Sequence, residues 1–229
     1  MDNIAIIPAR GGSKRIPRKN IKLFCGKPII AYSIETAIQS NLFDEIMVST
    51  DDDEIAETAI KYGATVPFIR SKKNSDDFAT THDVIMEVIT AYQNRENAFT
   101  YGCCIYPTAP LITAALLIKT YELLRDNNFD SVFPVVPYSY PIWRSLKLEN
   151  DTISMWWPEN KNKRSQDLPA SYHDAGQFYW FNISCIANTG SLLTHNTGAA
   201  LLNEMQVQDI DTPQDWEIAE FKYRYSQKL

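Results

Sequence analysis

Short apolar runs alternate with segments of helical periodicity along the first 136 residues of the chain. Residues 3–9 form a β-branched apolar run that ends just before a glycine pair, which is typical of a buried strand. After Pro28, which suits a first helical turn, apolar residues recur at helical spacing. This alternation predicts a mainly parallel sheet with helices on both faces. The predicted strands are 3–9, 45–50, 66–69, 103–106 and 131–136, and the predicted helices are 28–40, 55–62, 84–92 and 116–124.

The pattern changes over residues 138–174, where tryptophans and prolines flank a polar stretch. We expect a lobe of short strands there, inserted into a core domain made of residues 1–137 and 175–229. Exposed aromatic residues fit an arm that packs on a second subunit, although packing within a small lobe explains them as well. Beyond the lobe, the pattern predicts strands at 178–183 and 205–210, helical residues near 190–194, and a final helix with Thr212 as its N-cap.

The composition limits the classes of partner. The chain has 229 residues, 22 of them Lys or Arg and 28 Asp or Glu, for a net charge of −6. Such an acidic chain disfavours binding to nucleic acid or to an anionic membrane. The sequence shows no secretory leader and no apolar stretch approaching about 18 residues. We therefore expect a soluble cytoplasmic protein whose four cysteines, which lack zinc-site spacing, are reduced thiols.

Positive charge is concentrated directly after the first predicted strand, around Gly11 and Gly12. Ligands of open parallel sheets bind beyond the carboxyl ends of the strands, and glycines let backbone N–H groups approach an anion. A solvated basic loop would explain the charges as well, but their position in an acidic chain predicts a triphosphate site. The spacing matches neither a Walker A loop nor G-x-G-x-x-G. The basic residues are Arg10, Lys14, Arg15, Arg18 and Lys19.

Two acids near the other end of the chain suggest a metal site. Asp209 and Asp211 lie at the end of the predicted strand 205–210. Residues two apart on a strand point to the same side, so both carboxylates can converge on one cation. Magnesium prefers one or two carboxylates together with phosphate oxygens and water. The alternative is a pair of surface acids at a strand end.

Several segments together resemble the CMP-sialic acid synthetases, a family of cytidylyltransferases. IPARGGSKRIPRKN at 7–20 is similar to the family pattern A-R-x-x-S-K-x-x-x-x-K-N, and GKPII follows at 26–30. Within that family, YHDAGQFYW at 172–180 is most similar to the pseudaminic acid cytidylyltransferases. The other matching segments are FDEIMVSTDD at 43–52, SDDFATT at 75–81, YPTAPL at 106–111, RSQDLPASYHDAGQFYWF at 164–181 and DIDTPQDW at 209–216.

The resemblance implies a fold and an activity. The fold is Rossmann-like, the three-layer α/β fold of nucleotide-diphospho-sugar transferases, with a mainly parallel, mixed sheet and a small inserted dimerisation lobe. The activity is transfer of CMP from CTP to the anomeric hydroxyl of a nonulosonic acid, with Mg²⁺ as cofactor and pyrophosphate as product. A homodimer is implied as well.

The resemblance also assigns roles to single residues. Lys19 lies at the position of a lysine that stabilises charge on the α-phosphate. Asp211 and a hydroxide held by the metal are both open as the base. The catalytic set is Arg10, Lys19, His173 and Asp211, and the metal pair is Asp209 and Asp211. The nucleotide-binding set is Arg10, Gly11, Gly12, Ser13, Lys14, Asn20, Arg70, Asp77, Ala79 and Thr81. The sugar-binding set is Tyr106, Pro107, Thr108, Arg164, Gln177 and Tyr179.

Three departures from the family pattern bear on the sugar. Tyr106 replaces a glutamine, Ile112 replaces an arginine, and HDAG at 173–176 replaces an Arg-x-Asn-Gly stretch. We expect His173 to contact a phosphate or carboxylate where the family uses arginine, with a surface or interface histidine as the alternative. Fewer amide and guanidinium groups favour a less hydroxylated sugar, with pseudaminic acid ahead of legionaminic and N-acetylneuraminic acids.

Other classes of protein remain as alternatives. They are nucleotidyltransferases of sugar 1-phosphates, cofactor guanylyltransferases, 3-deoxy-octulosonate cytidylyltransferases and a non-catalytic nucleotide-binding regulator. The Lys19-Asn20 pair argues against the first two, and the presence of both Asp209 and Asp211 argues against the last.

Overall fold

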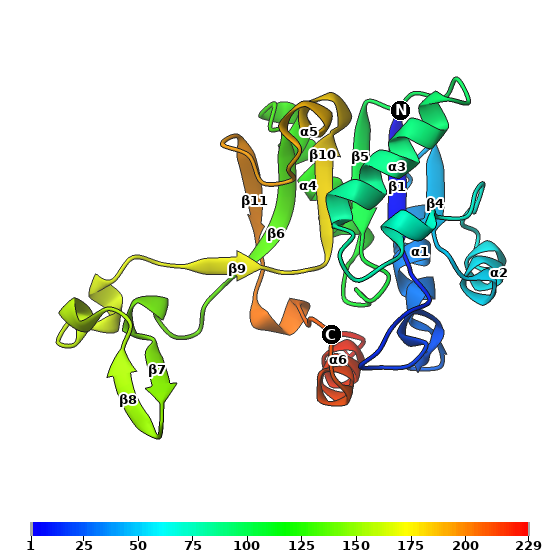
Figure 1. Ribbon diagram of the computed structural model, residues 1–229. Helices are drawn as coiled ribbons and strands as arrows, with labels where there is room; N and C mark the ends of the chain where they lie inside the picture. The colour runs from blue at the N-terminus through cyan, green and yellow to red at the C-terminus, as the bar shows by residue number, and fades with distance from the viewer. Residues whose placement is uncertain (1, 229) are drawn as a thin grey trace.

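The computed structural model describes residues 2–228 and confirms a three-layer α/β fold (Figure 1). The sheet is mixed and mainly parallel, as predicted, because only two of its strands run antiparallel to the others. Within the described residues the sheet has seven strands: β11 (Thr197–Leu201), β6 (Ser131–Pro137), β10 (Phe178–Asn182), β5 (Tyr101–Ile105), β1 (Asn3–Pro8) and β4 (Glu45–Ser49) in spatial order, with β9 (Tyr172–Asp174) paired to β6.

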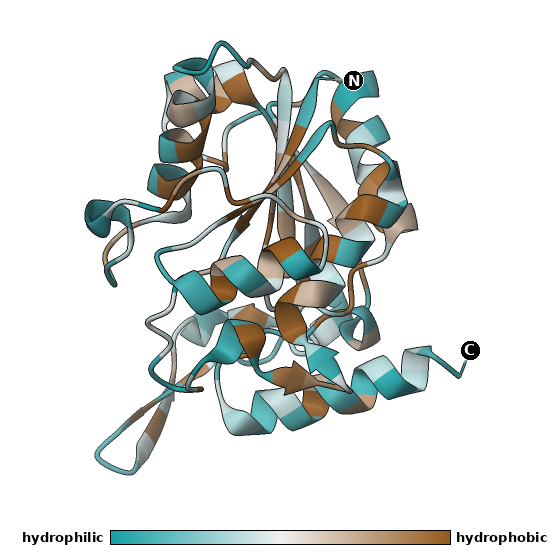
Figure 2. Ribbon diagram, turned by 90° about the vertical axis from the view of Figure 1, so that its right-hand side faces the viewer, coloured by the Kyte–Doolittle hydropathy of each residue, from teal (hydrophilic) through white to brown (hydrophobic). Residues whose placement is uncertain are grey.

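Alternate side chains of β1 pack against opposite helical layers. Ala5 and Ile7 belong to the core shared with α1 (Ile29–Ser40), α2 (Asp53–Lys61) and α4 (Ala114–Asp126). Ile4 and Ile6 belong to the core shared with α3 (Thr81–Gln93) and α5 (Ile183–Thr189). Figure 2 shows hydrophobic residues along the strands and recurring on the helices at either side. Burial of both faces therefore confirms the predicted layers.

A smaller core joins the two ends of the chain. Phe24, from the hairpin β2 (Leu23–Phe24) and β3 (Lys27–Pro28), packs with Trp216 of α6 (Pro213–Ser226). Thr212 and Asp215 form a capping box at the start of α6, which confirms the predicted N-cap. Because of this packing, the C-terminal helix lies next to the segment that follows β1.

The predicted strand at 66–69 is wrong. Thr65 forms one isolated bridge with Met47, and residues 66–69 form no ladder. Pro67 has no N–H to donate to a neighbouring strand. The helix predicted near 190–194 is also wrong, because Gly190, with φ 70°, is the C-cap of α5 and ends that helix.

The predicted strand at 205–210 is wrong as well, so Asp209 and Asp211 do not lie on a strand. A 3-10 helix at Glu204–Gln206 is followed by irregular chain up to α6. The apolar residues that suggested a strand face two different cores: Val207 packs under β6, and Ile210 packs with Trp216. The remaining 3-10 helices are Lys19–Ile21, Lys72–Asn74, Ile142–Arg144, Pro158–Asn160 and Ser165–Asp167.

Residues 138–171, the part of the predicted lobe that precedes β9, form an arm that projects away from the sheet (Figure 1). It contains the hairpin β7 (Leu146–Glu149) and β8 (Thr152–Met155). Trp143 packs within the arm: its ring lies 5.6 Å from that of Trp157, and its indole N–H donates to the Pro169 carbonyl at 2.9 Å. Across residues 2–228, none of the helices combines the length and apolar character that a membrane span requires.

Candidate active site

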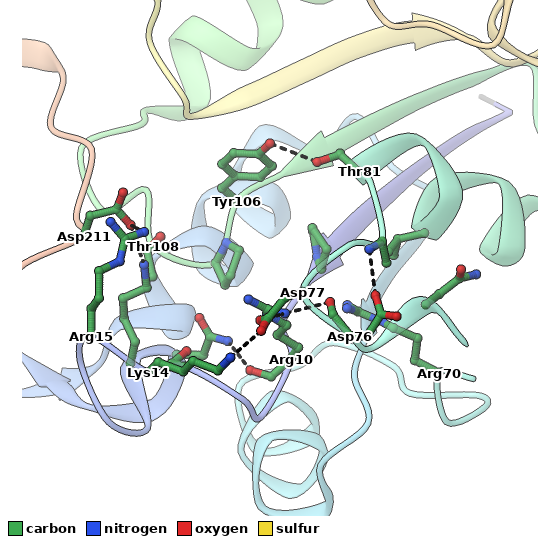
Figure 3. Close-up of a pocket in the computed structure, with 18 of the residues that line it drawn as sticks. Arg10, Lys14, Arg15, Arg70, Asp76, Asp77, Thr81, Tyr106, Thr108 and Asp211 are labelled. Atoms are coloured by element: carbon green, nitrogen blue, oxygen red, sulfur yellow. Dashed lines mark hydrogen bonds and ion pairs between the residues drawn. The ribbon is translucent and has the colours of Figure 1, made fainter. Parts of the chain in front are cut away.

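A pocket of about 620 Å³ lies beyond the carboxyl ends of β1 and β5 (Figure 3). The chain passes from β1 to β4 on one side and then to β5 on the other. This reversal is where open α/β sheets bind ligands. Most of the predicted site residues line this pocket: Arg10, Ser13, Lys14, Lys19, Asn20, Arg70, Asp77, Ala79, Thr81, Tyr106, Pro107, Thr108 and Asp211.

The loop after β1 carries its cations along one wall of the pocket. The Asn20 amide donates to the Arg10 carbonyl at 2.9 Å and so fixes the start of the loop. The Arg10 guanidinium donates to the Asp76 carbonyl at 2.7 Å and contacts the Asp77 carboxylate at 2.9 Å. Lys14 pairs with the same Asp77 carboxylate. The two cations therefore converge on one small volume, which suits an oxyanion.

Asp211 also lines the pocket, and it brings a segment from much later in the chain to the loop. Arg15 contacts its carboxylate at 2.8 Å, and the Lys19 ammonium lies 3.5 Å from the same oxygen. Lys19 also donates to the Ile210 carbonyl at 2.7 Å, and its side chain is only 20% exposed. The opposed charges predicted from the two ends of the chain do meet in one pocket.

Polar side chains hold the irregular segment that carries Asp211. Gln177 donates to the Gln206 carbonyl at 2.7 Å, and Lys222 of α6 donates to the Val207 carbonyl at 2.6 Å. The Asp215 carboxylate accepts from the backbone N–H of Asp211 at 3.1 Å. These contacts replace the ladder that a strand would have supplied.

The two acids of the predicted metal pair differ in position. Asp211 lines the pocket, whereas Asp209 is not among its lining residues. The pKa of Asp209 is raised, first by desolvation and second by the negative charge of Asp211. Within residues 2–228 no cluster of three or more His, Cys, Asp or Glu side chains could hold a metal. The charge effect indicates that the two carboxylates lie near each other, but only Asp211 faces the pocket, so the Mg²⁺ pair stays a prediction.

The glycine pair lies in the loop but does not line the pocket. The Gly11 N–H donates to the Asp51 carboxylate at 2.9 Å. A β-carbon at Gly11 would lie 2.7 Å from a carboxylate oxygen of Asp52, so this close approach requires glycine. Gly12 has no atom within 4 Å of such a β-carbon. Arg18 pairs with Asp52 and Glu54 and serves the loop rather than the pocket.

Tyr106 and Arg70 define two other sides of the pocket. Arg70 is 6% exposed, and its guanidinium donates to the Ser49 side chain at 2.9 Å and to the Ser49 carbonyl. The Tyr106 hydroxyl lies 3.0 Å from that of Thr81, and burial raises its pKa. Ile112, which replaces the family's arginine, is buried in the main core and does not line the pocket.

A second pocket, of about 520 Å³, adjoins the first through a pair of tyrosines. The ring of Tyr179 lies 5.5 Å from that of Tyr106, and its hydroxyl donates to Asp174 at 2.7 Å. His173 lines this second pocket, where its Nδ1 lies 2.9 Å from the Asp174 carbonyl. The structure therefore does not bring His173 to the loop cations, and its predicted catalytic role stays a prediction.

Two predicted sugar contacts lie outside both pockets. Arg164 is on the arm, where it pairs with Asp167 at 2.8 Å. Gln177 is 2% exposed, and its side-chain oxygen has no hydrogen-bond partner. Sequence reasoning missed other lining residues, namely Asn74, Asp76, Thr80 and Val84 of the first pocket and Phe133, Leu192 and Leu193 of the second. Asp76 could have been found from its place beside Asp77 in the matching segment 75–81.

The fold and the cation-lined pocket define a nucleotide-binding α/β protein whose site suits a polyphosphate. A family model described as "Cytidylyltransferase" matches residues 4–209, and the chain belongs to this family of enzymes. A pseudaminic acid cytidylyltransferase of Campylobacter jejuni is 44% identical and covers 98% of this chain and 97% of its own. A CMP-N,N'-diacetyllegionaminic acid synthase of Legionella pneumophila is 33% identical, over 95% of this chain and 94% of its own.

Solved structures agree with the predicted fold class. CMP:2-keto-3-deoxy-manno-octonic acid synthetase, in complex with CTP, superimposes over 100% of both chains with a TM-score of 0.72 at 17% identity. The 4-diphosphocytidyl-2C-methyl-D-erythritol synthase of Anaerococcus prevotii gives a TM-score of 0.63 at 16% identity, over 98% of both chains. The Rossmann-like nucleotide-diphospho-sugar transferase fold is confirmed.

Proposed function

We propose that the protein transfers CMP from CTP to pseudaminic acid and releases pyrophosphate. The carrying observation is one pocket that joins the loop cations to Asp211, in a chain 44% identical over 98% of its length to a pseudaminic acid cytidylyltransferase. The relatives named for legionaminic and N-acylneuraminic acids are 33% and 36% identical. Pseudaminic acid is therefore favoured as the sugar.

The nucleotide phosphates are assigned to the side of the pocket where Arg10, Lys14 and Lys19 lie. Arg10 and Lys14 both contact the Asp77 carboxylate, so their geometry also suits a phosphate group in its place. The cytidine then extends toward Arg70 and the start of α3, where Ala79 and Thr81 line the pocket. The helix N-terminus there offers further backbone N–H donors.

The sugar is assigned to the side of Tyr106 that leads to the second pocket. Phe133, Leu192 and Leu193 supply apolar contacts there, and His173 and Asp174 supply polar tips. A sugar with N-acyl and methyl groups suits such a lining. This placement puts Tyr179 between the two substrates' subsites, because its ring contacts Tyr106.

In the proposed reaction, the anomeric oxygen of the sugar forms a bond to the α-phosphorus of CTP. The bond from that phosphorus to the bridging oxygen breaks and pyrophosphate leaves, while the hydroxyl proton passes to a base, for which Asp211 is the candidate that lines the pocket. Lys19 is positioned to stabilise the charge on the transferring group, and Arg10 and Lys14 to hold the leaving pyrophosphate. Asp209 and Asp211 would hold Mg²⁺, which when bound offsets the repulsion between two anionic substrates.

A panel of acidic sugars tests this assignment. With CTP and Mg²⁺, mass spectrometry of the products should show CMP-pseudaminic acid formed with the highest kcat/KM, ahead of the legionaminic and N-acetylneuraminic acid products. Pyrophosphate release should require the sugar. Preference for another nonulosonic acid would overturn the sugar assignment. If the protein binds CTP but releases no pyrophosphate with any of the sugars, a non-catalytic regulator is favoured.

We also propose a homodimer that forms through the arm. In the β7–β8 hairpin, Leu148 lies opposite Ile153 and Leu146 opposite Met155, so one face is wholly apolar. Leu146, Leu148 and Ile153 are 57–69% exposed. An isolated hairpin with an exposed apolar face is only marginally stable, and a second copy of the chain would cover that face.

A cytoplasmic location is proposed as well, because all four cysteines are free thiols.

Charge on the apolar face of the hairpin should dissociate the dimer. Leu148→Lys is expected to give a monomer in sedimentation velocity under conditions where the wild type is a dimer. Ser154→Lys is the matched control, because it adds the same charge to the opposite face of the same hairpin. If both variants stay dimeric, or if the wild type is a monomer, this interface is wrong.

A further inference from the structure

An acid of the protein lies between the cations that the proposed function reserves for phosphate. The Asp77 carboxylate contacts Arg10 at 2.9 Å and also pairs with Lys14 (Figure 3). Asp77 itself lines the pocket, and its side chain is 46% exposed. Hydrogen bonds from Lys14 and Arg10 lower its pKa, so the carboxylate is held in its charged form.

We propose that Asp77 is an internal anion that competes with the substrate's phosphate groups for Arg10 and Lys14. It keeps the two cations converged while no nucleotide is bound, and it must give way when pyrophosphate or CTP binds. This competition weakens the affinity of the site for anions and thereby favours release of pyrophosphate after the reaction. The inference rests on the proposed nucleotide site, but it does not depend on which sugar is used.

Asp77 can leave the cations without disrupting the loop that carries it. Glu87 of α3 accepts from the backbone N–H and the hydroxyl of Ser71, both at 2.7 Å. On the other side, the Asp76 carboxylate accepts from the N–H groups of Phe78 and Ala79 at 2.9 and 2.8 Å. None of these hydrogen bonds involves the Asp77 side chain. Its release therefore breaks only the two ion pairs.

The number of negative charges decides whether the Asp77 carboxylate or a polyphosphate occupies Arg10 and Lys14. Ion pairs between exposed groups are weak, so a single carboxylate holds Arg10 and Lys14 only loosely. A polyphosphate brings several negative charges and more acceptor oxygens, and it displaces the carboxylate. Once displaced, Asp77 stays near the bound phosphates on a tethered loop, and the like charges repel each other. Both effects lower the affinity for phosphate.

Calorimetric titration with inorganic pyrophosphate, in EDTA and at low ionic strength, tests the inference. Asp77→Asn should bind pyrophosphate about fivefold more tightly than the wild type, the range expected for loss of weak competing ion pairs. Glu54→Gln is the matched control: it removes the same charge from a partner of Arg18, which does not line the pocket. We expect that control to stay within about twofold of the wild type. In high salt the gain of Asp77→Asn should shrink.

A weaker or unchanged affinity in Asp77→Asn would overturn the inference, because it would make Asp77 a ligand of the anion or a bystander. Failure of the wild type to bind pyrophosphate would overturn it as well. Turnover with CTP and pseudaminic acid is measured separately. If the wild type shows no turnover but Asp77→Asn binds pyrophosphate more tightly, the proposed sugar transfer is refuted and the inference about Asp77 stands. If the wild type turns over normally but Asp77→Asn binds pyrophosphate no more tightly, the inference about Asp77 is refuted and the proposed sugar transfer stands.

Discussion

Asp211→Asn is expected to lower kcat by about 100- to 1000-fold while the fold is retained. The substitution keeps the shape of the side chain and removes the only carboxylate of the metal pair that lines the pocket. The Asp211 pairs with Arg15 and Lys19 are partly exposed, so their loss should change stability little. Steady-state pyrophosphate release, titrated with Mg²⁺, measures the effect, and thermal unfolding followed by circular dichroism checks the fold.

Glu217→Gln is the matched control for this variant. Glu217 is an exposed acid on α6, a few residues beyond Asp211, and it does not line the pocket. The control should retain the wild-type kcat and the wild-type dependence on Mg²⁺. If Asp211→Asn also turns over at close to the wild-type rate with Mg²⁺, the metal assignment is wrong.

Lys19→Met should lower kcat at saturating CTP by about 100-fold, because the positive charge beside the transferring phosphate is lost. Methionine retains the apolar stem, but the Ile210 carbonyl then loses its donor. An unpaired, partly buried carbonyl costs about 1 kcal/mol, which corresponds to roughly 2–4 °C in Tm for a chain of this size. Fixed-time assays of product formation measure the loss of kcat, and thermal unfolding measures the loss of stability separately.

Lys22→Met provides the comparison for Lys19. Lys22 is an exposed lysine of the same loop, lies over the Trp216 ring at 4.7 Å and does not line the pocket. Its loss should leave kcat within about twofold of the wild type. A Lys19→Met enzyme that keeps its kcat, with a higher KM for CTP alone, would assign Lys19 to binding rather than to the chemical step.

Three of the strands that the sequence predicts correctly are buried almost continuously. In β1 every residue from Asn3 to Ile7 is buried, and β5 and β10 are similar. The missed strand β11 is rich in small residues and alternates buried with exposed positions. Its Gly198 is required because the Phe129 ring would lie 2.5 Å from a β-carbon there. Such a contact between distant residues leaves no local pattern that could predict the strand.

The site follows the same rule. The loop after β1 could be predicted because charge and glycine are concentrated in a short segment at a favoured place of the fold. The approach of Asp211 to that loop could be inferred only from opposed charge. The strand expected to bring Asp209 and Asp211 to the same side does not form. The pairing of Asp77 with Arg10 and Lys14 joins positions more than 60 residues apart, and nothing local indicates it.

The contacts of Lys19 with Ile210 and Asp211 span 191 and 192 residues of sequence. Closing so long a loop is entropically costly and is repaid only after the intervening sheet has formed. A growing polypeptide on the ribosome thus has its cationic loop long before the acid that faces it is synthesised. Catalytic competence would arise only after Asp211 and α6 have been synthesised and α6 has docked on the β2–β3 hairpin.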